Sequence, residues 1–197
     1  MRLPPHPKVL AVFALLVTTV VSVTHCTTAD KIANNQALNL QKRLGQVIPA
    51  ESFDNRLYDD QINIYDHTSE QNRTIYRATL NNKPTAAIIT ATAPDGYVDD
   101  INLLIGIYKN GTIATVRVTG HRETPGLGDR IEYRRSDWIT GFDGFTATEP
   151  TVWAVKKDNG DFDQLTGATV TSRAVVHAIR DTLTFFHSHK DQILNVE

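Results

Sequence analysis

Four hydroxyl side chains lie within seven positions of the segment DQLTGATVTSRAV, residues 163–175, around a Gly-Ala pair: Thr166, Thr169, Thr171 and Ser172. An amphipathic pattern follows them directly, so the segment is typical of a helix start. A helix amino terminus exposes unsatisfied N–H groups and the positive end of the dipole, which together stabilise a bound phosphate. A simple cap by Thr166 or Thr169 needs only one of the four hydroxyls. On spacing alone, a cap and a phosphate-binding turn both stay open.

A second segment that could contact a ligand is GHRETPGLGDRIE, residues 120–132, which holds three glycines and a proline around Glu123 and Thr124. Such a loop keeps backbone N–H groups accessible. The alternative is a strand-ending turn that satisfies only itself. His121 and Glu123 lack HExxH spacing and have no second histidine nearby, so we expect no metal site here.

The common nucleotide-binding and nucleophile motifs GxSxG, Walker A and the Rossmann GxGxxG are all missing from the sequence. Cys26 is the only cysteine, which rules out an internal disulfide or a cysteine metal cluster. Arg2 and Lys8 account for two of the 20 basic residues, so the part from Asp30 onward carries 18 basic against 22 acidic residues. This negative balance predicts that the protein has no nucleic-acid partner. Because the nucleophile motifs are missing, we also expect no catalytic side chain.

Strand patterns are concentrated in the middle of the chain. Residues 73–80 and 84–93 are rich in β-branched residues and flank an Asn-Asn-Lys-Pro turn, which predicts a hairpin. Residues 101–120 predict a second hairpin, in which Asn110 and Gly111 would supply the two positive-φ positions of a tight turn.

The carboxyl-terminal part combines one more predicted strand, residues 151–157, with a helix that follows Thr169. Residues 51–66 are acidic and have no assignable pattern. The helix has a period of 3.6 residues and one largely apolar face: Val175, Ala178, Ile179, Thr182, Leu183 and Phe186. Strand runs followed by a terminal helix, without regular βαβ alternation, predict an α+β fold.

The amino-terminal segment is uncharged over residues 9–23, and its extension to Thr28 gives 20 residues, enough to span a bilayer of roughly 30 Å at roughly 1.5 Å per residue. We expect an uncleaved anchor. The alternatives are a signal peptide cleaved at a weak small-residue site at residues 27–29, and lipoprotein processing at Cys26. Arg2 and Lys8 favour a cytoplasmic amino terminus with the remainder exported. A helix over residues 30–47, ended by Pro49, is expected to follow the span directly.

The anchor, residues 93–107 (APDGYVDDINLLIGI), GHRETPGLGD and DQLTGATVTSRAV together resemble the G subunit of the Rnf (also called Rsx) ion-translocating oxidoreductase complex. The resemblance covers nearly the whole chain and extends to the C subunit of the sodium-pumping NADH:quinone reductase. It implies an anchor at 1–28, a membrane-proximal helix at 29–50 and an FMN-binding domain at 51–197, built of antiparallel hairpins packed with helices. The chain would cross the bacterial inner membrane once, with its domain on the periplasmic side.

In this family, a flavin transferase attaches FMN through a phosphoester, with FAD as the donor, at an acidic-x-x-Ser/Thr-Gly-Ala-Thr pattern. The resemblance implies attachment at Thr169 and transferase recognition at Asp163, with Thr166, Gly167 and Ala168 as the rest of the motif. Thr166 and Thr171 would remain hydrogen-bond donors. It also places Glu123, Thr124 and Leu127 of the ETPGLG segment against the flavin. Asp99 and Asp100 depart from the small residue expected after Gly96-Tyr97 and put the local turn in doubt.

The implied function is electron carriage within a complex that passes electrons between ferredoxin and NAD and couples this to ion translocation; alone, the chain would not be a complete enzyme. Its partners would be the other Rnf/Rsx subunits and, during maturation, the flavin transferase. The alternatives are a stand-alone, membrane-tethered covalent-FMN module of another periplasmic redox pathway, a module that binds FMN noncovalently, and a binding or assembly module without flavin.

Overall fold

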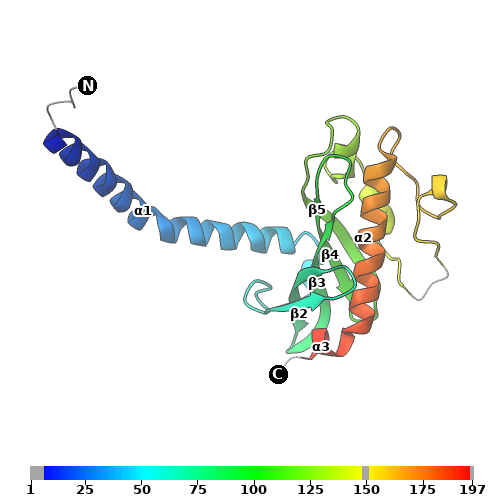
Figure 1. Ribbon diagram of the computed structural model, residues 1–197. Coiled ribbons are helices and arrows are strands. Elements are labelled where there is room, and N and C mark those ends of the chain that lie inside the picture. Colours follow the sequence, from blue (N-terminus) through cyan, green and yellow to red (C-terminus); the bar gives the residue numbers. More distant parts are fainter. Residues whose placement is uncertain (1–6, 148–150, 196–197) are drawn as a thin grey trace. The chain divides into compact units, whose positions relative to one another are not determined.

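The computed structural model describes residues 7–147 and 151–195 of the chain, which divides into two compact units, Met1–Leu40 and Gln41–Glu197. Most of the first unit is helix α1, Pro7–Leu44 (Figure 1). The apolar run and the helix expected over residues 30–47 form this one continuous helix, which ends at Leu44, five residues before Pro49.

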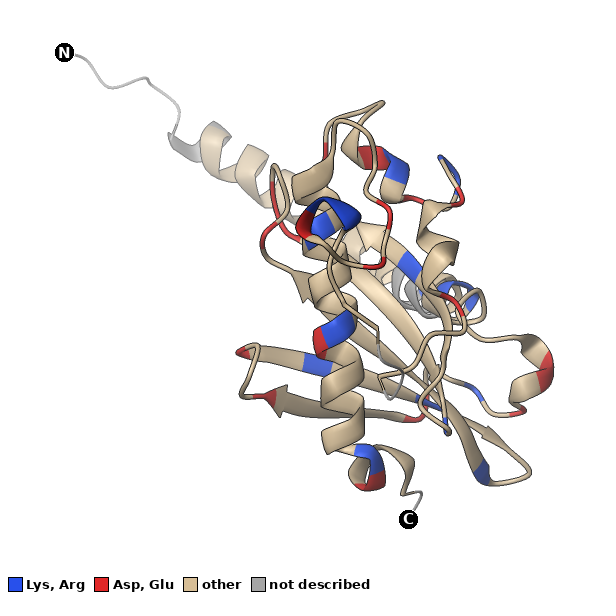
Figure 2. Ribbon diagram, turned by 90° about the vertical axis from the view of Figure 1, so that its right-hand side faces the viewer, with Lys and Arg blue, Asp and Glu red and all other residues tan. Residues whose placement is uncertain are grey.

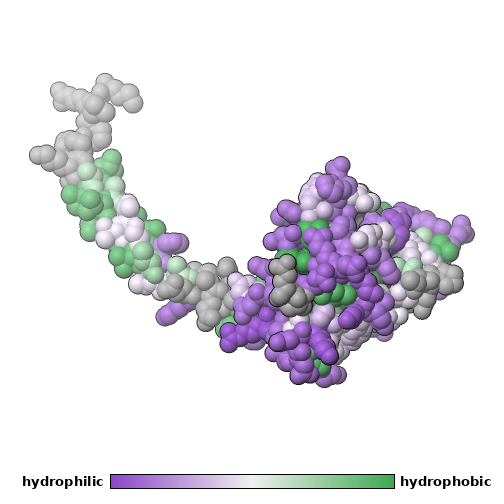
Figure 3. Space-filling view, turned by 90° about the horizontal axis from the view of Figure 1, so that it is seen from below, coloured by the Kyte–Doolittle hydropathy of each residue, from purple (hydrophilic) through white to green (hydrophobic). Residues whose placement is uncertain are grey.

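Helix α1 contains one segment that is long and apolar enough to cross a membrane, Leu10–Ala29, with 20 residues and a mean hydropathy of 1.9. Its apolar side chains are exposed (Figure 3). The threonine hydroxyls in and beside this segment donate to carbonyls four residues earlier, for example Thr18 to Ala14 at 2.8 Å and Thr24 to Val20 at 2.8 Å. These bonds satisfy the hydroxyls without water, as a lipid environment requires.

The second unit is built on a five-stranded antiparallel sheet in the order β1-β2-β3-β4-β5. Its strands are β1 Gln61–Asp66, β2 Gln71–Leu80, β3 Lys83–Ala93, β4 Ile101–Tyr108 and β5 Ile113–Gly120. Helices α2, Thr169–Ser188, and α3, Lys190–Leu194, follow the sheet. Short 3-10 helices lie at Ala50–Ser52, Gly128–Ile131, Trp138–Phe142 and Lys156–Asp158. The fold is α+β, as predicted.

Both predicted hairpins form, but only one has the expected turn. Asn81 and Asn82, with φ of 52° and 57°, join β2 to β3. Between β4 and β5, Gly111 has a φ of 94°, whereas Asn110 is not among the positive-φ residues, so the prediction of two such positions was wrong there. The loop spans residues 109–112, and within it the Asn110 side chain accepts a hydrogen bond from the Thr112 N–H at 3.0 Å.

Two strand assignments also differ from the sequence prediction. Strand β1 lies in the segment that had no assignable pattern, where Ile64 and Asp66 are buried between exposed residues. Residues 151–157 do not form the predicted strand. Their polar backbone groups are satisfied locally: the Ala154 N–H donates to the Val152 carbonyl at 2.7 Å, and the Lys156 N–H to the Phe162 carbonyl at 2.7 Å. Only Val155 forms an isolated bridge, to Phe162.

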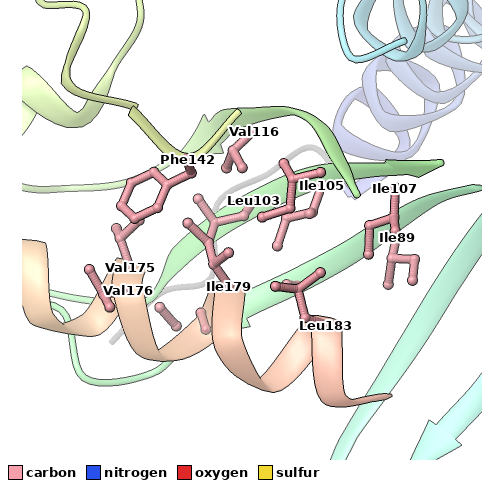
Figure 4. Packing of buried hydrophobic residues seen from close by; sticks show 14 of the residues in the cluster. Ile89, Leu103, Ile105, Ile107, Val116, Phe142, Val175, Val176, Ile179 and Leu183 are labelled. Atoms are coloured by element: carbon pink, nitrogen blue, oxygen red, sulfur yellow. The ribbon is translucent and has the colours of Figure 1, made fainter. Parts of the chain in front are cut away.

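Helix α2 covers one face of the sheet with the apolar face that its periodicity predicts. Val175, Ile179 and Leu183 pack toward Leu103, Ile105, Ile107 and Ile89 of β4 and β3 (Figure 4). Burying side chains of this size stabilises the fold by roughly 1.5–3 kcal/mol each. Toward solvent, basic and acidic residues are interspersed (Figure 2), as in the Arg173–Asp158 pair at 2.6 Å.

The other face of the sheet is covered by the end of α1 and the segment that follows it. Leu44, Val47, Ile48 and Leu57 are buried there. The approach is close at Gly106 of β4, where an added Cβ would lie 2.7 Å from the Val47 carbonyl oxygen. The sheet therefore lies between two apolar layers. These layers cover its faces, so a binding site would be formed by the loops at the ends of the strands.

Candidate functional site

A pocket of about 450 Å³ lies where three segments distant in sequence meet: the turn after β3, the loop after β5 and the start of α2. Its lining contains six of the predicted site residues and four others: Tyr97, Glu123, Thr124, Leu127, Gly128, Gly167, Ala168, Thr169, Val170 and Thr171. The two segments that the sequence singled out thus form one cavity. Its volume is within the roughly 300–1,000 Å³ of ligand pockets.

The amino terminus of α2 opens on this pocket. Thr169 is the first helical residue and Ala168 precedes it without a side-chain cap. Neither Thr166 nor Thr169 uses its hydroxyl in a hydrogen bond to any residue that the structure describes, so the simple threonine cap does not form. The first N–H groups of this 20-residue helix and its dipole are left to attract an anion.

The other two hydroxyls of the segment are used within the protein. Ser172 donates to the Ala168 carbonyl at 3.0 Å and accepts the Leu165 N–H at 3.0 Å, which fixes the turn before the helix. Thr171, 1% exposed, donates to Oε2 of Glu123. The expectation that Thr171 remains an available donor was therefore wrong.

Glu123 lies behind the pocket surface and is only 4% exposed. Its Oε1 accepts the Val98 N–H at 3.1 Å and its Oε2 accepts the Thr171 hydroxyl. Its own N–H donates to Nδ1 of His121 at 3.0 Å. One carboxylate thus joins all three segments of the site, which makes Glu123 a positioning residue whose oxygens are already occupied.

Gly128 is required beside this carboxylate. An added Cβ would lie 2.8 Å from Oε2 and 2.9 Å from Cβ of Glu123, and 3.0 Å from Oγ1 of Thr171. We expect Gly128→Ala to lower the free energy of unfolding by about 1–3 kcal/mol, because the Glu123–Thr171 contact must shift.

Urea unfolding of the full chain without flavin, followed by the fluorescence of Trp138 and Trp153, measures this loss. The matched control is Gly141→Ala, since Gly141 has no atom within 4 Å of an added Cβ. Equal stability of the two variants would contradict the packing role of Gly128.

The loop that carries Leu127 is held by its own backbone. The Thr124 carbonyl accepts the N–H groups of Leu127 and Gly128 at 3.2 and 3.1 Å, and Asp129 Oδ1 accepts the Gly126 N–H at 2.8 Å. Leu127 is 44% exposed, and its Cδ2 is the nearest atom to an added Cβ on Gly167, at 3.0 Å. The leucine therefore lies against the Gly-Ala turn.

Two apolar residues of the pocket were not among the predicted site residues. Tyr97 is 69% exposed and Val170 is 43% exposed. Tyr97 lies in the segment where Asp99 and Asp100 put the turn in doubt. The turn nevertheless closes on Gly96, where an added Cβ would lie 2.0 Å from the Asp99 carbonyl oxygen. No periodic pattern marks either residue, although Val170 is adjacent to the predicted attachment threonine.

Asp163 lies outside this pocket. Its side chain is 73% exposed and pairs with Lys156 at 2.8 Å, and its carbonyl accepts the Trp138 Nε1–H at 2.6 Å. It lines a separate cavity of about 370 Å³ with Trp138, Phe142 and Phe162. Among the residues that the structure describes, no three His, Cys, Asp or Glu side chains are grouped to hold a metal ion.

Comparison with known proteins places the site in a class. Residues 96–184 match the FMN-binding domain family, and this range contains the whole pocket. Residues 8–47 match the RnfG N-terminal region. The fold and site are therefore those of an FMN-binding domain joined to an amino-terminal helix.

The chain belongs to the family formed by the G subunits of ion-translocating oxidoreductase complexes. It is 42% identical over 193 residues to the G subunit of Aliivibrio fischeri (strain MJ11), covering 95% of this chain and 92% of the relative. It is 43% identical over 190 residues to that of Vibrio vulnificus (strain YJ016), covering 94% and 90%. The protein is thus a redox subunit of a multi-subunit complex. The family membership and the apolar Leu10–Ala29 segment together indicate that the protein is anchored in a membrane.

The fold is also similar to the crystal structure of Shewanella oneidensis NqrC, with a TM-score of 0.52 and 18% identity. The match covers 73% of this chain and 72% of that one. It supports the α+β architecture.

The pocket fits a phosphate-bearing flavin. The start of α2 would bind the phosphate group, and the small residues Gly167 and Ala168 leave room for its approach. Leu127, Val170 and Tyr97 offer exposed apolar surface to a ring system. The Thr169 hydroxyl makes no hydrogen bond to any described residue, and among the unbonded hydroxyls of this lining it is the one at the first residue of α2.

Proposed function

We propose that the protein carries electrons on FMN joined covalently to Thr169 through a phosphoester. The observation that carries the proposal is the free hydroxyl of Thr169 at the start of α2, inside the pocket that the FMN-binding domain forms. FMN supplies the redox chemistry when bound. The chain's residues hold it, orient it and tune its surroundings.

Attachment requires a flavin transferase and FAD. The Thr169 oxygen forms a bond to the FMN phosphorus, the pyrophosphate bond to the AMP portion breaks, AMP leaves and the hydroxyl proton is released. The helix N–H groups stabilise the negative charge of the resulting phosphodiester. A covalent link suits an exported carrier, since such a protein could not recapture lost FMN.

The full assignment is an Rnf/Rsx-type subunit whose complex links ferredoxin and NAD to ion translocation. Its soluble domain would lie on the periplasmic side of the inner membrane, with the anchor at 1–28, the membrane-proximal helix at 29–50 and the domain at 51–197. The name of the related subunits and the amino-terminal span support this assignment. The basic residues Arg2 and Lys8 support the orientation.

Mass spectrometry of the denatured full chain, co-expressed with a flavin transferase, tests the covalent link. The expected result is the added mass of FMN less one water on the peptide that contains Thr169. Flavin that is released on denaturation would instead show noncovalent binding. A chain without flavin, beside a transferase that labels another acceptor, would support the binding or assembly module.

The variant Asp163→Ala tests whether the flavin transferase recognises the Asp163 side chain. Because its side chain is exposed and its ion pair among the described residues is a surface contact with Lys156, Asp163→Ala should change the free energy of unfolding by less than about 1 kcal/mol. We expect covalent flavin occupancy to fall several-fold while folding is retained. The measurement is the labelled fraction after a fixed reaction time, with the exposed Asp137→Ala as control. Equal labelling of both variants would remove Asp163 from the recognition site.

A further inference from the structure

A separate pocket of about 330 Å³ lies beside the last turn of α1, along β5 at the edge of the sheet. Three arginines from three different segments line it: Arg43 at the end of α1, Arg117 on β5 and Arg134 in the loop after Gly128–Ile131. Leu104 and Val118 form part of its apolar floor, and Tyr133 one wall. The flavin-binding proposal does not use this pocket.

None of these arginines forms an ion pair within 4 Å with any residue in the described part of the chain, where seven such pairs occur outside this pocket. The acidic groups nearby have other partners. Glu132 pairs with His121 at 2.8 Å. Asp143 hydrogen-bonds to the Val116 backbone and to Thr115, and the Arg117 charge also acts on it, although the two side chains form no ion pair within 4 Å. The three arginines still outnumber these two carboxylates. The pocket therefore holds an excess of positive charge.

Arg117 is held in place before any ligand arrives. Its guanidinium carbon lies 4.4 Å from the centre of the Tyr133 ring, and its Nη1 donates to the Val116 carbonyl at 2.8 Å. The remaining N–H groups form a fixed fork of the kind that binds a carboxylate through two hydrogen bonds. Arg43 and Arg134 are exposed and add two further guanidinium groups.

We propose that this arginine pocket docks an acidic segment of another subunit of the complex, with a carboxylate of that subunit on Arg117 and its neighbours. Protein interfaces are enriched in arginine and aromatic residues, and residues of these types often contribute most of the binding energy. The pocket combines both with an apolar floor. The inference rests on the proposed function only in that the chain works inside an assembled complex.

A lipid headgroup is the weaker occupant. Its phosphate would use the arginines alone, whereas a protein segment would also contact the apolar floor of Leu104 and Val118 and the Tyr133 wall.

The test compares the full-length, tagged chain with the double variant Arg43→Glu/Arg134→Glu, each produced in membranes with all other subunits of the complex. The matched control is Lys83→Glu/Lys109→Glu, which makes the same charge change on two exposed residues, one at the start of β3 and one in the turn between β4 and β5. We expect the control to retain wild-type stoichiometry and the arginine variant to lose about tenfold or more of its partner subunits. Equal retention in both variants would overturn the proposal.

Two further readouts identify the occupant. A photo-crosslinking phenylalanine analogue at Tyr133 should label a peptide of another subunit that contains Asp or Glu, and charge reversal in that peptide should restore assembly of the arginine variant. Cross-links only to lipid or to a second copy of this chain would refute the proposal. The covalent flavin content should be equal in all variants. Measuring it separates a loss of partner subunits from a failure of flavin attachment.

Discussion

Thr169→Val is expected to abolish covalent flavin attachment while leaving the domain folded. Valine keeps the β-branched volume and removes only the hydroxyl, which makes no hydrogen bond to any described residue. No protein contact is lost, so the stability should change by less than about 0.5 kcal/mol. The labelled fraction, measured by intact mass after co-expression with the transferase, should fall from near completion to background.

The matched control is Thr166→Val, because Thr166 is an exposed threonine three residues earlier whose hydroxyl is also free. This variant should keep its covalent flavin. Retained flavin in Thr169→Val would refute the attachment site, and loss in both variants would show that the transferase reads the whole hydroxyl pattern. Urea unfolding of each variant without flavin separates these results from misfolding.

The largest expected effect on stability is that of Arg73→Met. Arg73 and Asp66 are 2% and 4% exposed, and Arg73 Nε lies 2.8 Å from Asp66 Oδ2. Arg73 also donates a hydrogen bond to Thr182 of α2 at 3.0 Å, so this side chain links strands β1 and β2 to the helix. Methionine fills much of the volume but leaves Asp66 buried without its cation, and we expect a loss of about 3–5 kcal/mol.

Urea unfolding at pH 7, followed by tryptophan fluorescence, measures this loss. Arg180→Met is the control, because the Arg180–Asp181 pair at 2.8 Å is largely exposed and should contribute less than about 1 kcal/mol. A loss no larger than that of the control would show that the buried pair is not stabilising.

The loss should also depend on pH. Burial by itself would raise the pKa of Asp66, but hydrogen bonds from Ser69 and Arg73 and the Arg73 charge hold this pKa below its usual value. The wild-type carboxylate therefore stabilises the fold above a pH of about 4, and this contribution is lost as the pH falls toward the lowered pKa. In Arg73→Met the pKa of Asp66 rises, because burial still disfavours the carboxylate and only the Ser69 and Thr68 hydrogen bonds still favour it. The difference in stability between wild type and variant should therefore shrink as the pH falls below about 4, and a constant difference would contradict this account.

Regular patterns predicted the regular parts of the fold. The period of 3.6 residues identified the buried face of α2, and β-branched runs identified strands β2 to β5. Strand β1 was missed because its alternation is short and its inward position 66 is a charged residue, which burial tolerates only through Arg73. Residues 151–157 have strand-forming composition, but their backbone bonds go to one another and to Phe162 instead of to the sheet, and local composition contains no information about that.

The candidate site was predicted in outline because its two segments have unusual local composition. That they meet in one pocket follows from the sheet order, which hairpin signals alone do not determine. Thr171 illustrates the limit. Its hydroxyl looked available beside Thr169, but its partner, Glu123, lies 48 residues away and becomes a neighbour only after folding.

The Glu123 carboxylate has a consequence for the order of maturation. Every bond that shapes the acceptor turn is made between protein groups: Ser172 with Leu165 and Ala168, and Glu123 with Thr171 and Val98. For the attachment proposed at Thr169, the acceptor turn would therefore be preorganised, and the binding energy of the transferase would not have to offset the entropy cost of ordering it. Folding can precede modification, and a short peptide of residues 163–175 would be a poor acceptor because it lacks the distant carboxylate that orders the turn.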